Sequence, residues 1–163
     1  MKTIGLLSDT HSLIDQEILN FFKDVDEIWH AGDIGSMEVV NLLESTKPFR
    51  AVYGNIDDYR IRQEFPEIQE FNYENLNILM IHIGGYPGKY EKKVRDILKQ
   101  KSFDLFISGH SHILKVIYDK KYDMMHINPG AAGKSGFHNV RTAIKFKIKN
   151  SKLNDLQIFE MKR

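Results

Sequence analysis

The sequence predicts an α/β or α+β sandwich in a single domain that spans residues 1–163. Short apolar runs rich in branched residues recur along the chain, and several are followed by apolar residues at helical spacing. The length suits one domain, and 42% hydrophobic with 28% charged residues allows one core without the charge excess of a disordered chain. We therefore expect a chain that folds alone around one interior.

The first three apolar runs predict three strands, and helices follow the first two. The run at residues 4–7 precedes a polar loop, the run around residues 28–29 ends at Gly32-Asp33, and the run at residues 49–53 ends at Gly54-Asn55. Residues at helical spacing follow the first and second runs: Leu13, Ile18, Leu19 and Phe22, then Met37, Val39, Val40 and Leu43.

The next part of the chain predicts two hairpins separated by a helix and a buried strand. In order, these elements are residues 70–83, 90–100, 105–107 and 113–127. The hairpin turns are predicted at Glu74-Asn75 and Asp119-Lys120. Asn128-Pro129-Gly130 then indicates another turn.

The last segment, residues 142–161, predicts a strand with one solvent-exposed face, followed by a turn that reverses the chain. Apolar residues alternate with lysines there, the pattern of a half-buried strand: Ile144, Phe146 and Ile148 against Lys145, Lys147 and Lys149. We expect the turn at Asn150-Ser151.

Candidate metal ligands follow five of the predicted strands directly. Loops beyond the carboxyl ends of strands converge in α/β sheets, so side chains distant in sequence can meet there. Two carboxylates, four imidazoles and one amide oxygen form a ligand set that suits manganese, iron or zinc better than calcium or magnesium. These candidates are Asp9, His11, Asp33, Asn55, His82, His110 and His112.

Two ligand pairs are separated by one residue. Asp9 with His11, and His110 with His112, stand just past a predicted strand, where extended geometry would send both side chains of a pair the same way. We therefore expect each pair to hold one site. Glycines at positions 32, 54 and 109 permit tight turns beside a bound ion or phosphate.

Each candidate also has a structural alternative. Asp9 and Asp33 precede helical patterns and could be helix caps, and Asn55 could be a turn residue. The other three histidines are expected to be packed or surface residues, although His30 could support a ligand and His138 could reach a substrate. The ordered set of seven strand-end residues favours ligation over these alternatives.

The fragments SDTH, AGDI, YGNI, IHIG and SGHSH occur in the order found in the calcineurin-like metallophosphoesterases, and the chain resembles their small prokaryotic phosphodiesterase branch. The resemblance implies a four-layer α/β/β/α sandwich of two mixed sheets flanked by helices, with two metal ions at one edge. It assigns four residues to the first ion and four to the second, with Asp33 shared: Asp9, His11, Asp33 and His112, then Asp33, Asn55, His82 and His110.

The same resemblance implies a phosphodiesterase that hydrolyses a small or activated phosphate ester through a hydroxide bridging two divalent ions. Manganese is the first choice of metal, with iron, zinc or nickel as alternatives. The catalytic residues implied are Asp33, Asn55, His82 and His110.

The chain departs from many relatives at Ile56, where they place a histidine that can protonate the leaving group. The acidic residue that supports that histidine in relatives is present as Asp57, with no evident role here. We therefore hypothesise that the enzyme favours esters with acidic leaving groups, which need little help from a general acid.

Composition limits the other classes of function. The chain has no cysteine, which excludes disulfides and thiolate ligands, and no signal-peptide core or stretch of membrane-spanning length, so we expect a cytoplasmic protein without a membrane partner. A net charge of +1 gives nucleic acid little general attraction, and the basic stretch at residues 89–101 is expected to be a solvated helix face. A nuclease and a non-catalytic scaffold of this fold, such as the retromer subunit, are the alternatives; the oligomeric state is left open.

Overall fold

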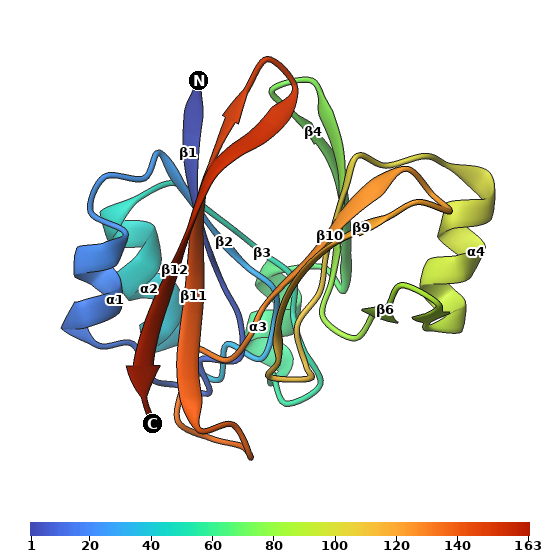
Figure 1. The fold of residues 1–163 in the computed structure, drawn as a ribbon. Coiled ribbons are helices and arrows are strands. Elements are labelled where there is room, and N and C mark those ends of the chain that lie inside the picture. The colour runs from blue at the N-terminus through green and yellow to red at the C-terminus, as the bar shows by residue number, and fades with distance from the viewer.

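The computed structural model describes residues 1–163 and contains two five-stranded mixed sheets that pack face to face (Figure 1). One sheet has the order β12-β11-β1-β2-β3: Lys152–Lys162, Val140–Lys149, Lys2–Leu7, Glu27–His30 and Phe49–Ala51. The other has the order β4-β5-β8-β10-β9: Ile68–Tyr73, Leu76–Ile81, Leu105–Ile107, Met124–Pro129 and Leu114–Asp119.

Helices cover the outer faces of both sheets, so the molecule has four layers. Figure 1 shows α1 (Gln16–Phe21) and α2 (Met37–Thr46) outside the first sheet, and α4 (Lys92–Gln100) outside the second. The four-layer α/β/β/α sandwich is therefore confirmed. None of the helices is both long and apolar enough to span a lipid bilayer.

The parallel strands of each sheet place their carboxyl ends at one end of the molecule. β1 pairs in parallel with β2, and β2 with β3; in the second sheet β5 and β10 both pair in parallel with β8. Leu7 lies opposite His30, and His30 opposite Ala51, so the loops that follow these three strands begin at the same level. This common edge, at the bottom of Figure 1, holds the predicted ligands.

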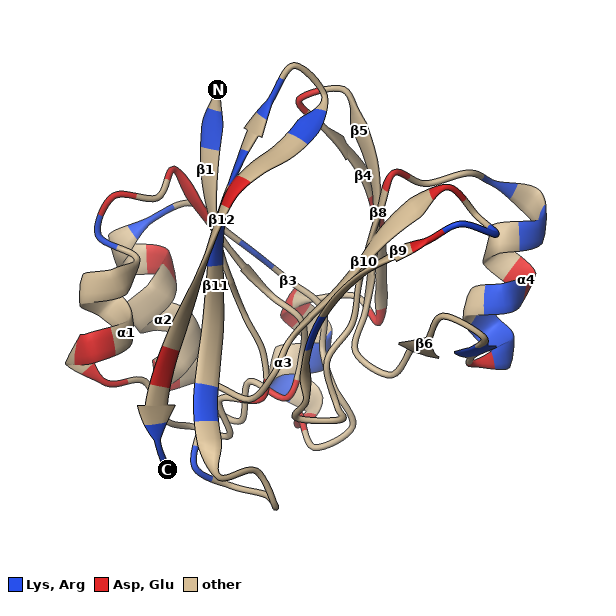
Figure 2. Ribbon diagram, in the orientation of Figure 1, with Lys and Arg blue, Asp and Glu red and all other residues tan.

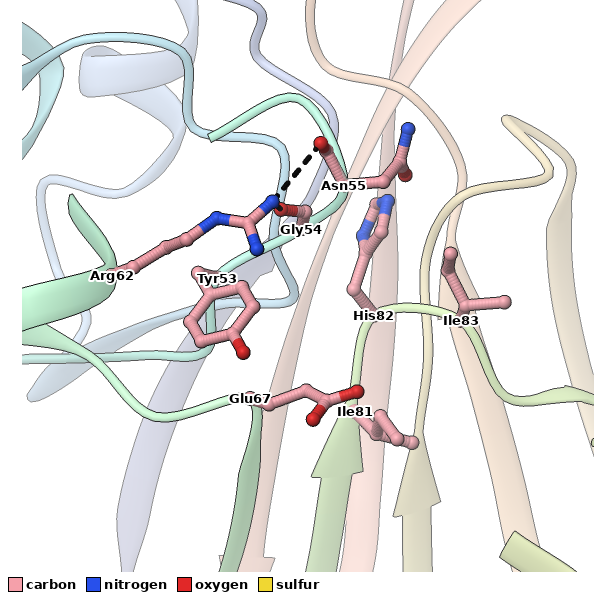
Figure 3. A pocket seen from close by; sticks show the side chains of 8 residues that line it. All are labelled: Tyr53, Gly54, Asn55, Arg62, Glu67, Ile81, His82 and Ile83. Atoms are coloured by element: carbon pink, nitrogen blue, oxygen red, sulfur yellow. Dashed lines mark hydrogen bonds between the residues drawn. The ribbon is translucent and has the colours of Figure 1, made fainter. Parts of the chain in front are cut away.

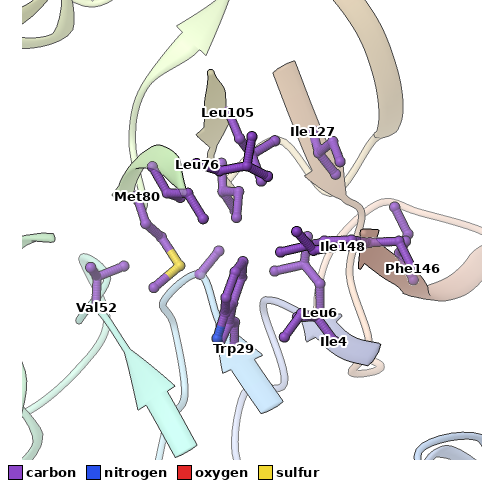
Figure 4. Packing of buried hydrophobic residues seen from close by; sticks show 14 residues of the cluster. Ile4, Leu6, Trp29, Val52, Leu76, Met80, Leu105, Ile127, Phe146 and Ile148 are labelled. Carbon is purple, nitrogen blue, oxygen red and sulfur yellow. The ribbon is translucent and has the colours of Figure 1, made fainter. Parts of the chain in front are cut away.

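The main core lies between the two sheets and centres on Trp29 (Figure 4). The Trp29 ring is fully buried and meets Phe71 and Tyr73 edge-on at 5.2 and 5.3 Å between ring centroids. Alternation along β1 explains the two-sided burial: Ile4 and Leu6 face this core, while Leu7 faces the core beneath α1 and α2. Truncating a buried aromatic side chain of this kind costs about 3–5 kcal/mol.

Most predicted elements are confirmed, and the differences concern short segments. Helix α3 (Tyr59–Glu64) was not predicted because it has six residues and buries only Ile61, too little for a periodic pattern. The hairpin of β6 (Gly85–Tyr86) and β7 (Lys89–Tyr90) was missed because each strand has two residues.

Turn chemistry was a good guide to the hairpins. The predicted turns at residues 74–75 and 150–151 are confirmed, and all four residues there have left-handed φ values between 49° and 63°. The turn between β9 and β10 comes later than predicted, at residues 120–123, because Asp119 still belongs to β9. Asp119 is buried and accepts a hydrogen bond from the Tyr90 hydroxyl, which holds it within the strand.

Candidate metal centre

The loops after β1 and β2 are joined by backbone hydrogen bonds. The amides of Asp9 and His11 donate to the carbonyl oxygens of Gly32 and Asp33, at 3.0 and 3.1 Å. Neither aspartate caps a helix, because α1 is capped at Asp15 and α2 at Ser36. The capping alternative for Asp9 and Asp33 is therefore wrong.

The backbone at the ligand residues is left-handed rather than extended, so our expectation of extended geometry is wrong. Five of the seven candidates have φ between 46° and 70°: Asp9, His11, Asp33, His110 and His112. Asp and His tolerate this region better than most residues, but the conformation carries local strain that surrounding structure must offset. The sharp bends it allows turn successive side chains toward a common centre.

The candidate side chains form two adjacent groups, and within each group the ligand atoms lie within 4.8 Å of one another. The groups are Asp9, His11 and His112, and Asp33, His82 and His110. His110 and His112 therefore belong to different groups, which agrees with the assignment implied by the resemblance and contradicts the expectation from spacing that this pair would hold one site.

Contacts between the two groups bring all seven predicted residues together. His11 Nε2 lies 3.5 Å from Asp33 Oδ2, and His82 Nε2 lies 3.8 Å from Asp9 Oδ1. Asn55 joins the second group, since its Oδ1 is 3.1 Å from His110 Nδ1. Both carboxylates thus lie near a histidine of the other group, and Asp33 makes the closer approach.

The tautomer of His82 fits a metal ligand. Its Nδ1–H donates to the Ala31 carbonyl oxygen at 2.8 Å, which leaves the Nε2 lone pair facing Asp33 Oδ2 at 3.2 Å. A lone pair and a carboxylate repel each other unless a proton or a metal ion lies between them. Three buried atoms here have no hydrogen-bond partner: Asp9 Oδ1, His11 Nε2 and His82 Nε2. The donor set therefore fits divalent metal ions.

Electrostatics within the site keep the carboxylates ionised. Burial by itself would raise the pKa of Asp9, but contacts with His11 and His112 outweigh it and hold that pKa well below its usual value. Burial likewise opposes the charged form of His82, but the Asp33 and Asp9 carboxylates raise its pKa above the ordinary value. The site is a concentration of negative charge that favours cations.

Asp57 connects the loop of Asp33 to the loop of Asn55. Its buried carboxylate accepts three backbone hydrogen bonds, from Ile34, Gly35 and Gly54, at 3.2, 2.8 and 2.8 Å. The role left open in the sequence is thus structural here.

His30 braces the same loops and does not contact a ligand side chain. Its Nδ1 accepts from the Gly32 amide at 3.1 Å, and its Nε2–H donates to Thr10 Oγ1 at 3.0 Å, because the Thr10 hydroxyl donates to Ile34. Burial lowers the pKa of His30 to about 3, so the ring is neutral. His126, on β10, is also buried, and burial lowers its pKa to about 4, so its ring is neutral as well.

His138 contacts a ligand, which the sequence did not indicate. Its Nε2–H donates to the Gly133 carbonyl oxygen at 2.8 Å, so its Nδ1 accepts a hydrogen bond from His112 Nδ1–H at 3.1 Å. His112 Nε2 then faces Asp9 Oδ1 at 3.1 Å with a free lone pair. Only the structure reveals this contact, because Gly133 and His138 follow the last recognisable motif.

A pocket of about 210 Å³ opens beside Asn55 and His82 (Figure 3). Arg62 stacks on the Tyr53 ring at 4.6 Å and donates to the backbone carbonyl of Asn55 at 3.2 Å. Glu67 lies below the Tyr53 ring in Figure 3. The lining of the pocket therefore includes one basic and one acidic side chain, Arg62 and Glu67, and two candidate metal ligands.

Comparisons with known proteins agree with this geometry. Residues 1–151 match the model of the calcineurin-like phosphoesterase superfamily domain. A probable metallophosphoesterase from Methanothermobacter thermautotrophicus is 34% identical over 134 residues, which are 78% of this chain and 76% of that protein. The sequence similarity therefore extends over most of both proteins.

Two solved structures share the fold over nearly their whole length. A novel archaeal phosphodiesterase has a TM-score of 0.76 with 22% identity, over 98% of this chain and 99% of that chain. Wild-type Vps29 from Entamoeba histolytica, complexed with zinc, has a TM-score of 0.74 with 18% identity, over 98% of each chain. At these identities the two structures establish the fold alone.

Proposed function

The chain belongs to the calcineurin-like phosphoesterase superfamily, and from that premise we propose that it is a phosphodiesterase that acts on a small or activated ester with two divalent metal ions. The observation that supports this most is the pairing of two ligand groups across Asp33, whose Oδ2 lies 3.2 Å from His82 Nε2 and 3.5 Å from His11 Nε2. A carboxylate between two sets of nitrogen ligands is suited to bridge two cations.

Each ion would be held by four side chains. The first set is Asp9, His11, Asp33 and His112, and the second is Asp33, Asn55, His82 and His110. When bound, the pair of cations would acidify a water molecule and neutralise charge on the phosphoryl oxygens. Manganese suits this mixture of oxygen and nitrogen ligands, with iron, zinc and nickel as the other candidates.

The candidate ligands differ in their exposure and therefore in their expected roles. Asp9, Asp33 and His82 are buried and hold their positions rigidly, whereas Asn55 and His110 are exposed and border the space that a substrate enters. Asn55 and His110 are therefore placed to touch the phosphoryl group as well as an ion. Hydrogen-bond partners fix the tautomer of a neutral imidazole ligand, as the Ala31 carbonyl oxygen does for His82, so that the lone pair of its other nitrogen faces the metal centre.

An apolar side chain, Ile56, occupies the position of the missing leaving-group histidine. The Ile56 side chain is 44% exposed, and its amide donates to Asp33 Oδ1 at 3.0 Å, so this position serves the backbone of the site only. We therefore propose a preference for esters with acidic leaving groups.

The nuclease alternative is weaker on the charge distribution. Four of the 23 Lys and Arg residues lie on α4, which Figure 2 shows outside the second sheet rather than at the edge that holds the ligands. On α4, Lys92 pairs with Asp96 at 2.6 Å and Lys93 with Glu67 at 2.5 Å. This helix is a solvated, largely compensated face rather than a track for phosphates.

The scaffold alternative is the strongest rival because metal binding does not exclude it. The Vps29 neighbour has been crystallised in complex with zinc and has the same fold, so bound metal alone would not establish catalysis. Turnover is therefore the deciding measurement.

We would screen phosphate mono- and diesters in the presence of manganese, nickel, zinc or iron. The variant Asp33→Asn should lose at least about a thousandfold in rate because the shared carboxylate charge is removed. Asp155→Asn is the control, since Asp155 is exposed and contacts Lys147 in the β11–β12 region. A folded, metal-loaded wild type that is inert on every ester would favour the scaffold.

A further inference from the structure

Large apolar side chains stand around the mouth of the metal centre. Three ligand residues are each followed directly by an exposed isoleucine: Asn55 by Ile56, His82 by Ile83 and His112 by Ile113. Phe137, directly before His138, is fully exposed. Single exposed apolar residues are ordinary, but several beside one polar centre indicate a recognition surface.

Two of these side chains line a groove that opens onto the ligands. The groove has a volume of about 480 Å³ and its lining includes Ile113 and Phe137. His110 and His112, one from each ligand group, form part of the same lining. We call this depression the Phe137 groove; it is separate from the pocket at Asn55 and His82.

The loop that carries Phe137 is anchored at several points. The Gly133 amide donates to the Asp9 carbonyl oxygen at 3.0 Å, and the Arg163 guanidinium donates to the Gly136 carbonyl oxygen. Gly136 has a φ of 127°, and a Cβ there would lie 2.3 Å from His112 Nδ1, so the loop can pack closely only with glycine at this position. The backbone that carries Phe137 is therefore held in place before any ligand arrives, which lowers the entropy lost on binding.

Charge distinguishes the two depressions beside the metal centre. The Phe137 groove is lined by no Lys, Arg, Asp or Glu, whereas the other pocket has Arg62 and Glu67 in its wall. A charged substituent in the Phe137 groove would find no Lys, Arg, Asp or Glu side chain of opposite charge in the lining. A flat apolar group would instead bury surface against Ile113 and Phe137.

We propose that the Phe137 groove binds an aryl substituent of the phosphate ester, which makes apolar phosphodiesters the preferred substrate class. This inference rests on the proposed phosphodiesterase function. A diester bound at the metal centre directs two substituents outward, and the two depressions that share ligand residues with the centre are available to receive them.

Binding of two non-hydrolysable anions to the manganese-loaded protein tests the groove directly. By isothermal titration calorimetry, phenylphosphonate should bind about tenfold more tightly than methylphosphonate, because burying one face of a phenyl ring adds that order of affinity. Phe137→Ser and Ile113→Asn should each lose most of this preference while their methylphosphonate affinity stays at the wild-type value.

Ile158→Asn is the matched control, because Ile158 on β12 is 44% exposed and lines neither depression. It should behave as wild type. Equal affinity of the wild type for the two phosphonates would overturn the proposal and would favour a protein partner as the occupant of the groove. A preference for phenylphosphonate that survives in both groove variants would also overturn it. Turnover of p-nitrophenyl esters by the same preparations distinguishes failure of the groove proposal from failure of the phosphodiesterase proposal. Turnover together with equal affinities for the two phosphonates overturns the groove proposal alone. Absence of both turnover and phosphonate binding overturns both proposals.

Discussion

The Nδ1 atoms of His112 and His138 lie 3.1 Å apart, and the opposite nitrogen of His138 lies 2.8 Å from the carbonyl oxygen of Gly133. The carbonyl can only accept, so it fixes the proton of His138 on Nε2 and makes Nδ1 an acceptor. His112 must then donate from Nδ1 and present Nε2 to the metal centre. One backbone carbonyl thus determines the tautomer of a candidate ligand two rings away.

Replacing His138 should weaken metal binding without unfolding the protein. In His138→Phe the His112 ring loses the acceptor that orients it, and the affinity for Mn²⁺ should fall about 10- to 100-fold. Calorimetric titration of the apoprotein with Mn²⁺ measures this loss. His138→Gln keeps an acceptor oxygen and should recover part of the affinity; an unchanged affinity in His138→Phe would contradict the tautomer argument.

Asp57→Asn should lower both stability and metal affinity. The amide has one acceptor oxygen in place of two, while Ile34, Gly35 and Gly54 continue to direct their N–H groups at it. We expect the free energy of unfolding to fall by about 2 kcal/mol, since a buried donor is left unpaired. Urea denaturation of the apoprotein measures the change.

The control for that variant is Asp96→Asn on α4. Asp96 pairs only with exposed lysines, and removing such a pair changes stability by about 0.5 kcal/mol or less. Equal losses in the two variants would show that Asp57 does not brace the loops.

Much of the site could be predicted from sequence because each ligand follows an apolar run. Asp33 and Asn55 were placed at strand ends by their Gly neighbours and by the strands before them. The division of His110 and His112 between two groups was not predictable from spacing, since it depends on left-handed backbone at both residues. The contact of His138 depends on packing of a loop that carries no periodic signal.

Hydrolysis should depend strongly on the acidity of the leaving group. Bis(p-nitrophenyl) phosphate should react far faster than a dialkyl phosphate, because the Ile56 side chain cannot donate a proton to the leaving group. Ile56→His should raise the rate on the alkyl ester by about tenfold or more and change the aryl rate less. Steady-state kinetics on both esters measure the ratio, and equal wild-type rates would defeat the hypothesis.

The buried ring of His126 should make stability depend on pH below neutrality. The ring packs against Phe106 at 4.9 Å between centroids, neither nitrogen has a hydrogen-bond partner, and burial lowers the pKa of His126 from 6.5 to about 4. Between these two values the unfolded chain binds a proton that the folded chain does not. Stability from this group is therefore fully present above pH 6.5 and is lost as pH falls toward 4.

The loss should reach about 2–3 kcal/mol at pH 4.5, because pH 4.5 lies roughly two pH units below the unfolded pKa and each unit is worth about 1.4 kcal/mol. Urea denaturation of the metal-free protein between pH 7.5 and 4.5 measures it. His126→Leu carries no such proton, so its stability relative to wild type should increase by that amount over the same range. Met125→Leu, the adjacent residue of β10, changes no titratable group and should keep a constant difference from wild type. A constant difference for His126→Leu as well would mean that the ring titrates alike in the folded and unfolded chains.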